Sequence, residues 1–331
     1  MTINKRHHGV IRYINCVKLL SALFLLSFLF FTQAVFAAEP AKFPAKAVKI
    51  MLPAGAGGSL GQEIRAIAPS LEKHLGVATV IEYVTGAEGM IAYNKFSKEK
   101  PDGYSLISFN LTSAISLELT RETAKYSVKN FTPIAVQNVK TFVLLVHPDR
   151  WKTFEEFLQE AKQKNVSLAA TGGAADLQGR LLESGTGIKF NWVPYTSAAE
   201  GMAAVAGKHV DAMLTFAITP RPMVMAGRLR ALAVFSAKPD PIMPGVPDFK
   251  SLKHDEVPLL LVYGIFAAPP KTPPGIVAVL DKAVKNACAD PEFKKLADNI
   301  GLIVDYKPTS ELLKLRAQNY ELLNKYKQFI K

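Results

Sequence analysis

The stretch that decides the fold reads Lys49-Ile50-Met51-Leu52-Pro53-Ala54-Gly55-Ala56-Gly57-Gly58-Ser59-Leu60-Gly61. Its apolar half predicts a β-strand over 48–53. The glycine-rich turn leads into an amphipathic helix that we expect from Ser59 to Leu75, closed by Gly76. A strand, a tight turn and a helix in this order leave backbone N–H groups unpaired at the positive end of the helix dipole. Because glycines let a ligand approach the backbone closely, this turn is predicted to form half of an anion-binding cleft.

A second glycine turn, Ala170-Thr171-Gly172-Gly173-Ala174, repeats this arrangement between a predicted strand over 166–170 and a helix expected from about 175 to 183. Two such turns facing one another would each bind one end of a dicarboxylate. Ligands of open α/β sheets bind outside the carboxyl ends of the strands, where both turns fall. The predicted ligand-binding residues are those of the two turns together with two hydroxyl donors: Ala54, Gly55, Ala56, Gly57, Gly58, Ser59, Thr112, Ser113, Thr171, Gly172, Gly173 and Ala174.

The alternation of strand-like and helix-like segments continues along the chain and predicts an α/β protein. Capping boxes at Thr153–Glu156 and Ser197–Glu200 mark two helix starts, and Thr309 or Ser310 is expected to cap the last helix. Apolar crossings near 139–146 and 259–266 separate two sets of strand and helix units. We therefore expect two lobes joined by a two-strand hinge, with lobe 1 formed by residues 38–140 and 259–331 and lobe 2 by residues 141–258.

The N-terminus has the pattern of a signal peptide. Four basic residues precede an apolar run over 19–31, and Val35-Phe36-Ala37 offers small residues for cleavage. We predict a signal peptide over 1–37, a cut between Ala37 and Ala38, and export to the periplasm. The alternative is an uncleaved anchor, because residues 19–38 are long enough to span a bilayer.

The remaining composition disfavours several functions. The net charge is +12, but the basic residues are scattered, so we expect no nucleic-acid partner. Cys288 has no second cysteine in the exported chain and lies in a helical pattern typical of a core position. The histidines show no metal-ligand spacing, and no G-x-S-x-G motif is present. We expect no catalytic residue, no metal and no cofactor.

The first turn allows two other interpretations. Gly55 and Gly57 after a strand, with Glu82 at the end of the next predicted strand, imitate a dinucleotide-binding fingerprint. Against it, the third glycine, Gly61, comes one position late, and export removes the chain from the cytoplasmic nicotinamide pool. The turn could also serve only to pack a strand closely on a helix.

Several segments occur in an order that resembles a known family. They are a proline- and glycine-rich turn at 53–58 followed by Arg65, a strand and glycine loop at 80–89, Pro101-Asp102-Gly103-Tyr104, Val193-Pro194-Tyr195, Gly207 with Val210-Asp211, and Gly227-Arg228-Leu229-Arg230-Ala231-Leu232-Ala233-Val234. From about Phe43 to Lys331 the chain is similar to the periplasmic solute receptors of tripartite tricarboxylate transporters, the Bug family.

This resemblance implies a two-lobed, type 2 periplasmic binding protein whose hinge closes a cleft around a carboxylate. It implies a small organic anion, di- or tricarboxylate-like, held by backbone amides of both turns and by ordered water. It also implies delivery of that ligand to membrane permease subunits, by a protein that we expect to be a monomer without catalytic turnover. The alternative is a periplasmic enzyme or a sensor input domain that uses the same cleft.

The chain departs from the family pattern at the cleft. Leu60 and Gly61 stand where the family usually has Thr-Asp, Tyr83 replaces an Asn, and Thr196-Ser197 replace Lys-Gly. Loss of a cleft-side Asp and Lys is expected to alter which carboxylate binds, or to admit a less polar ligand.

Overall fold

The structure is a computed structural model that describes residues 43–171 and 173–329. The predicted signal peptide over 1–37, its cut between Ala37 and Ala38, and the predicted site residue Gly172 lie outside the described residues. Residues 46–331 form one compact unit, which contains every strand and helix described below.

The first sheet has six strands in the order β11-β4-β10-β3-β1-β2. The three N-terminal strands run parallel, as the strand-helix alternation predicts, whereas β10 and β11 pair antiparallel with their neighbours. The strands are β1 (Val48–Leu52), β2 (Thr79–Tyr83), β3 (Ser105–Asn110), β4 (Thr132–Lys140), β10 (Val262–Ala268) and β11 (Ile303–Lys307).

The second sheet has five strands in the order β7-β6-β8-β5-β9. Its β6 pairs parallel with β7 and β8, while β5 runs antiparallel to β8 and β9. The strands are β5 (Phe142–Val146), β6 (Val166–Ala170), β7 (Phe190–Pro194), β8 (Ala212–Phe216) and β9 (Arg230–Phe235).

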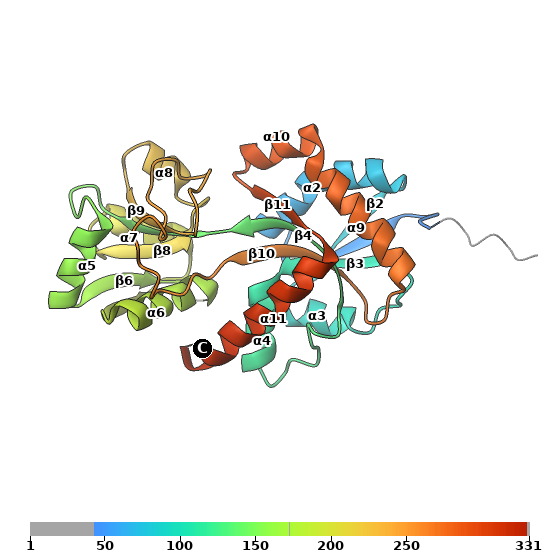
Figure 1. The fold of residues 1–331 in the computed structure, drawn as a ribbon, viewed down its shortest axis with the longest axis horizontal. Helices are drawn as coiled ribbons and strands as arrows, with labels where there is room; N and C mark the ends of the chain where they lie inside the picture. The colour runs from blue at the N-terminus through green and yellow to red at the C-terminus, as the bar shows by residue number, and fades with distance from the viewer. Residues whose placement is uncertain (1–42, 172, 330–331) are drawn as a thin grey trace, which may run out of the picture. The chain divides into compact units, whose positions relative to one another are not determined.

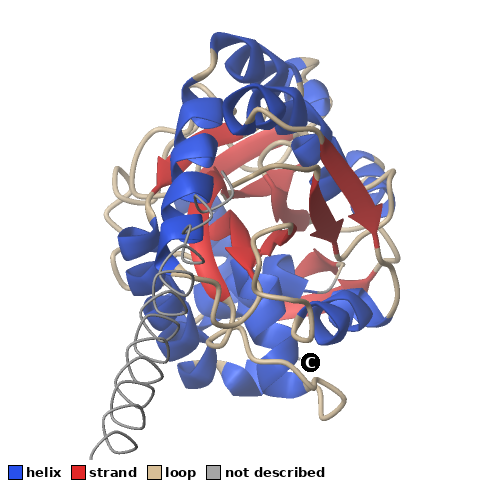
Figure 2. Ribbon diagram, turned by 90° about the vertical axis from the view of Figure 1, so that its right-hand side faces the viewer, coloured by secondary structure: helices blue, strands red, loops and turns tan. Residues whose placement is uncertain are grey.

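Helices lie on the outer sides of the strands (Figure 2). In the first sheet, α9 packs against both α2 and β4, and α11 packs against α4 and β4. Around the second sheet, α6 packs on β8, and α7 packs on β6 and β8. The helices are α2 (Ser59–Leu75), α3 (Met90–Phe96), α4 (Leu111–Thr120), α5 (Phe154–Gln163), α6 (Gly173–Thr186), α7 (Ala198–Ala206), α8 (Arg221–Met225), α9 (Pro274–Ala289), α10 (Pro291–Asn299) and α11 (Thr309–Lys325).

Two segments connect the sheets, as the apolar crossings predict (Figure 1). Thr141 alone separates β4 of the first sheet from β5 of the second. The return segment ahead of β10 is tied to α6 by Gln178, a fully buried side chain that accepts from Leu260 N at 2.7 Å and donates to Pro258 O at 3.1 Å. Both connections therefore restrict how the two sheets can move relative to one another.

Aromatic side chains form much of the core. Beneath the first sheet, Phe96, Phe109 and Phe131 are buried and meet edge to face, with ring centroids 5.2 Å and 6.2 Å apart. At β9 of the second sheet, the Phe235 ring stacks on the Phe249 ring, with the two ring centroids 4.3 Å apart. A fully buried side chain of this kind contributes about 1.5–3 kcal/mol through its apolar surface. These clusters hold the helices on the sheets and so fix where the strand ends lie.

The predicted elements are largely confirmed, with some corrections. Helix α2 has the predicted bounds and ends in the left-handed Gly76, and Thr153 and Ser197 cap their helices. Helix α6 begins at Gly173, two residues earlier than predicted, because Gly173 and Ala174 already belong to its first turn. The cap predicted at Thr309 or Ser310 was wrong. Pro308 holds the N-cap position, and the Thr309 hydroxyl donates to Ile134 O instead.

The helix α4 and the strand β11 were not predicted. Both are short, and α4 has an even apolar composition that gives little periodicity. Within the described ranges 43–171 and 173–329, no helix combines the length and the apolar character needed to cross a membrane.

Candidate functional site

Both glycine turns lie at the carboxyl ends of parallel strands. The first links β1 to α2, and Gly58 is the N-cap, with its N–H donating to Gly55 O at 3.2 Å. The N–H groups of Ser59, Leu60 and Gly61 belong to the first turn of the helix, where no intrahelical acceptor exists. Gly55 to Ser59 are exposed. The turn therefore presents donors to solvent at the positive end of a helix of 17 residues.

Arg65 of α2 braces the first turn. Its Nη1 donates to Ala56 O and to Tyr83 Oη, each at 2.8 Å. A Cβ atom at Gly61 would lie 2.8 Å from Ala56 O and 3.3 Å from the Tyr83 ring. Gly61 and Tyr83 are both departures from the family pattern, and the Tyr83 ring borders the space that a side chain at position 61 would need. The two departures are therefore structurally coupled.

The second turn links β6 to α6. Thr171 N donates to Asp176 Oδ1 at 3.1 Å, which closes the strand end onto the helix. Gly173 has a φ of +66°, a backbone conformation that favours glycine, and no atom lies within 4 Å of the position its Cβ would occupy. The first described residue of the helix is therefore open to the surroundings.

A cavity of about 540 Å³, here called the α4–α6 cavity, brings four predicted site residues together. Thr112 and Ser113 from α4 line one side, and Gly173 and Ala174 from α6 line the other. The Thr112 hydroxyl is committed to the protein, because it donates to Asn319 Oδ1 at 2.8 Å and the residue is 1% exposed. Ser113 is half-buried.

Two arginines that the sequence interpretation missed also line the α4–α6 cavity. Arg121 donates to Glu88 Oε1 at 3.2 Å. Arg180 donates to Glu183 Oε2 at 2.9 Å and lies over the Trp192 ring, with its guanidinium carbon 3.9 Å from the ring centroid. Both side chains are about one-third exposed, so each keeps a face toward the cavity. The wall of this cavity is polar and carries two arginines together with two carboxylates, Glu88 and Asp176.

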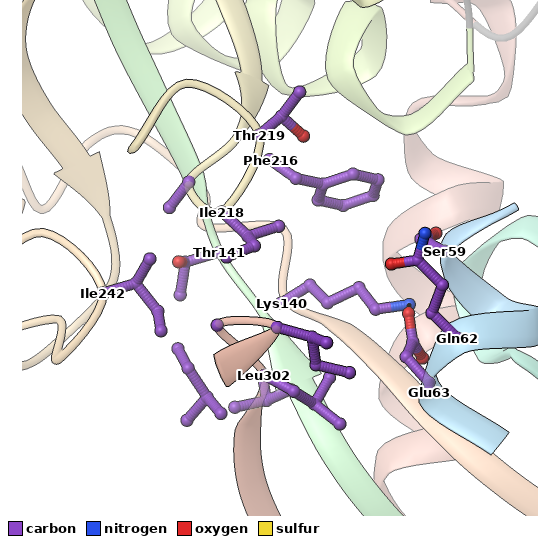
Figure 3. Close-up of a pocket in the computed structure, with 15 residues that line it drawn as sticks. Ser59, Gln62, Glu63, Lys140, Thr141, Phe216, Ile218, Thr219, Ile242 and Leu302 are labelled. Atoms are coloured by element: carbon purple, nitrogen blue, oxygen red, sulfur yellow. Dashed lines mark ion pairs between the residues drawn. The ribbon is translucent and has the colours of Figure 1, made fainter. Parts of the chain in front are cut away.

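A smaller cavity of about 240 Å³, here called the hinge pocket, lies beside the first turn (Figure 3). It is lined from α2, from the crossing between β4 and β5, from the end of β8 and from the loop ahead of β11. Gly301 in that loop has a φ of +63°, and a Cβ there would lie 1.7 Å from Ile218 Cδ1. The missing side chain lets Ile218 reach the opposite wall. The lining residues are Ser59, Gln62, Glu63, Val139, Lys140, Thr141, Phe216, Ala217, Ile218, Thr219, Ile242, Ile300, Gly301, Leu302 and Ile303.

A buried charge network forms the polar side of the hinge pocket. Lys140 Nζ lies 2.7 Å from Glu63 Oε1 and donates to Asn110 Oδ1 at 2.8 Å. Glu63 Oε2 accepts from Asn138 Nδ2 at 3.3 Å. The side chains of Lys140 and Glu63 are 8% and 4% exposed. Because Asn110 ends β3, Lys140 at the end of β4 ties the hinge to the strand end that leads into α4.

The predicted site residues are thus divided between two places. Ser59 lies in the hinge pocket, and Thr112, Ser113, Gly173 and Ala174 lie in the α4–α6 cavity. The other described members of the prediction, Ala54 to Gly58 and Thr171, line neither cavity.

The sequence pattern around Lys140 and Glu63 could have predicted that both side chains are buried. Lys140 is a lone charge inside an apolar run, and Glu63 falls on the buried face of α2 with Leu60, Ile64 and Ile67. A charge on an apolar face predicts a buried pair. Which partner each would meet depends on residues 77 positions apart (140 − 63), and only the fold brings them together.

Groups that could support covalent or metal chemistry are sparse in the described part of the chain. Burial raises the pKa of the Cys288 thiol to about 12, so the thiolate nucleophile is absent at neutral pH. Among the described residues, no group of three histidine, cysteine or acidic side chains is placed to hold a metal ion. The described site can therefore recognise a ligand through hydrogen bonds, through charge and through the shape of its cavities.

Comparisons with known proteins agree on one family. Residues 64–331 match the family model described as tripartite tricarboxylate transporter family receptor. A curated protein of Agrobacterium vitis, the UPF0065 protein in the TAR-I ttuE-ttuC' intergenic region, is 28% identical over 268 residues, which cover 79% of this chain and 77% of that protein.

Solved structures show the same architecture. A TctC solute binding protein from Polaromonas is 26% identical with a TM-score of 0.76, covering 85% of this chain and 97% of that chain. The R. palustris protein Rpa4515, solved with adipate, is 23% identical with a TM-score of 0.71, covering 87% of this chain and 98% of that chain, and at this identity the likeness shows the fold. The resemblance read from the sequence and the predicted two-lobed α/β fold with a hinge are confirmed.

Proposed function

The chain belongs to the family of tripartite tricarboxylate transporter receptors, and on this premise we propose that it captures a small organic anion of the di- or tricarboxylate class in the periplasm and delivers it to membrane permease subunits. The receptor releases its ligand unchanged. Residues 1–37 act as a signal peptide that is cleaved between Ala37 and Ala38. No nucleic acid takes part, and the receptor acts as a monomer.

One observation carries this proposal: two strand ends of each sheet lead into the two cavities. The start of α2, which follows β1, and the end of β8 border the hinge pocket, and α4 and α6, which follow β3 and β6, border the α4–α6 cavity. Lys140 lines the hinge pocket and donates to Asn110 at the end of β3, the strand that leads into α4. Ligands of α/β sheets bind at this edge.

The proposed ligand contacts follow from the chemistry of the turns. Backbone N–H groups of residues 54–57, 59 and 172–174 donate to the carboxylates, and the Thr171 and Ser113 hydroxyls add further donors. Each hydrogen bond to a charged group contributes about 1.5–3 kcal/mol.

We propose that the lobes of residues 38–140 with 259–331, and of residues 141–258, move about the hinge to close on the ligand. A ligand shifts this equilibrium only through contacts that it makes better in the closed state. The turns provide such contacts, because one belongs to each lobe.

The first experiment uses the full-length chain expressed with its own leader and recovered from the periplasm of a Gram-negative host. Its intact mass reports the cut site. A thermal-shift panel of mono-, di- and tricarboxylates follows. A ligand at 100 times its dissociation constant adds about 2.7 kcal/mol to the free energy of unfolding, which raises the melting temperature by several degrees. If no carboxylate shifts the melting temperature and no small molecule co-purifies, the proposed function is wrong.

A second measurement separates binding from turnover. After incubation, the ligand that gave the shift is recovered and analysed by mass spectrometry. We expect it unchanged in mass and amount. Conversion to a product would favour the periplasmic enzyme that uses the same cleft.

A further inference from the structure

The hinge pocket separates polar from apolar side chains. Figure 3 shows Ser59, Gln62 and Glu63 gathered around the amine end of Lys140, while Ile242 and Leu302 lie at the opposite end. Thr141 lies beside Ile242, but its hydroxyl donates to Asp240 and is already used within the protein. Phe216 and Ile218 lie between, and both are half-buried. A ligand that fits this pocket therefore needs one polar end and one apolar end.

The volume of the hinge pocket limits the size of that apolar end. An engineered cavity of about 150 Å³ lined by aliphatic and aromatic side chains binds benzene. The hinge pocket has about 240 Å³, which accommodates one ring or one short branched chain together with a carboxylate. A larger body, such as two fused rings with several substituents, does not fit in this volume.

Lys140 supplies the charge that would orient such a ligand. An ammonium group has three N–H donors, and the contacts to Glu63 and Asn110 use two of them. The Lys140 Nζ lies 6.0 Å from the centroid of the Phe216 ring, and both residues line the hinge pocket. The remaining donor can therefore meet a carboxylate that enters beside the N–H groups at the start of α2.

The same network disfavours a second carboxylate. Glu63 and one ligand carboxylate together already outnumber the single positive charge of Lys140, so a second carboxylate at the polar end would be repelled. A carboxylate at the far end would meet Ile242 and Leu302, which are 8% and 7% exposed and offer no hydrogen bond from their side chains. A charge in such surroundings loses its hydration without a partner.

We propose that the hinge pocket is the specificity subsite of this receptor and that it selects organic acids with a carboxylate at one end and an apolar body at the other. This inference rests on the proposed function, because it concerns the ligand of the same receptor. It keeps the small organic anion of the proposed function but replaces the di- or tricarboxylate class with acids that carry their negative charge at a single end.

The test compares acids of similar size that differ at the far end. Calorimetric titrations of the recovered protein use phenylacetate and 4-methylpentanoate against adipate and citrate. We expect the apolar-ended acids to bind more tightly than adipate by about ten-fold or more, because a single methylene in an apolar pocket already changes affinity by about that factor. Their binding also has the more negative heat-capacity change, which marks burial of apolar surface.

Two variants test whether the preference for apolar-ended acids arises in the hinge pocket. Ile218→Asn places an amide in the apolar wall and should weaken phenylacetate binding by about ten-fold or more while leaving acetate binding unchanged. The matched control is Leu313→Asn on α11, a residue that is 43% exposed and lines neither cavity, and it should bind phenylacetate like the wild type. Should Ile218→Asn fail to fold, Ile218→Thr keeps the branched shape and should give a smaller loss in the same direction.

The outcomes separate the two proposals. Tighter binding of adipate or citrate than of phenylacetate overturns the apolar subsite and supports the proposed receptor function. Wild-type affinity for phenylacetate in Ile218→Asn also overturns the subsite. Absence of binding by every acid overturns the receptor function itself.

Discussion

Single side chains decide the form of the first turn. Arg65 reaches back from α2 to the carbonyl of Ala56, and the Tyr83 hydroxyl accepts from the same nitrogen. Gly61 makes room for this arrangement, whereas Gly57 has no atom within 4 Å of the position a Cβ would take. The two glycines therefore differ in what a substitution would do.

We expect Gly57→Val to leave the free energy of unfolding nearly unchanged and to abolish anion binding, because its side chain would occupy the space in front of the turn. Gly61→Ala should behave differently. Its Cβ, 2.8 Å from Ala56 O, must displace the backbone, which costs about 1–3 kcal/mol of stability and weakens binding. Urea unfolding and calorimetry with the identified anion check both variants. Full affinity in Gly57→Val would show that the first turn does not contact the ligand.

Lys140 and Glu63 test how a buried pair contributes to stability. We expect Lys140→Met to lose about 3–5 kcal/mol, because Glu63 is left charged and buried without its partner. The double variant Lys140→Met with Glu63→Leu should recover most of this loss, since two apolar groups then replace two charges. Urea unfolding of the wild type, Lys140→Met, Glu63→Leu and the double variant measures the coupling. Equal losses in the single and double variants would contradict a direct pair.

At the level of elements, helix starts are set by local hydrogen bonds. The Thr153 hydroxyl accepts from Glu156 N at 3.1 Å, and Glu156 Oε2 accepts from Lys152 N at 2.7 Å. Thr153→Ala should lower the free energy of unfolding by about 1 kcal/mol, the usual contribution of such a cap. Ser310→Ala is the control and should be nearly neutral, because Ser310 is exposed in the first turn of α11 and does not cap that helix. A neutral result for both would mean that α5 needs no cap once packed on the sheet.

The start of β8 is joined to β6 by a carboxylate. Asp211 accepts from Ser167 N at 2.9 Å and from Ser167 Oγ at 2.7 Å, and Arg150 Nη1 lies 2.7 Å from its other oxygen. Burial by itself would raise the pKa of Asp211, but the Ser167 hydrogen bonds and the Arg150 charge outweigh it and hold that pKa below its ordinary value.

This shift predicts a dependence of stability on pH. A carboxyl whose pKa is lowered on folding stabilises the protein above its ordinary pKa, and the contribution is lost as the pH falls through the folded value. Asp211→Asn should therefore be less stable than the wild type at pH 7, and the difference should shrink below about pH 4. Urea unfolding at both pH values measures it. A difference that is the same at about pH 3 and at pH 7 would contradict the charge contribution.

At the scale of the whole molecule, the proposed function requires the two sheets to move on two connections. Because Thr141 alone separates β4 from β5, and Gln178 fixes the return segment to α6, we expect closure to be a hinge rotation with little change inside either sheet. Small-angle scattering of the recovered protein should show a smaller radius of gyration with the bound acid than without it. The same titration with Gly57→Val is the control and should show no change. An unchanged radius in the wild type at saturating ligand would rule out closure.

Local chemistry explains why much of this protein could be predicted from its sequence. The helix α2, its left-handed end at Gly76 and the capped starts of α5 and α7 depend on residues within a few positions of one another. The ordered motifs likewise identified the family, because each marks a turn or strand end that the fold requires. The errors fell where local signals are weak, at the short helix α4 and at the cap of α11.

The sequence by itself determined the α/β alternation, the two glycine turns and the family to which the chain belongs. Only the tertiary structure decided which residues share a cavity. It placed Ser59 with Lys140 and Ile218, and Ser113 with Gly173 and Arg180. The physical reason is that a turn is specified by neighbours in the chain, whereas a cavity is bounded by strand ends and loops far apart in sequence. Their positions follow from the packing of both sheets, and no local pattern encodes them.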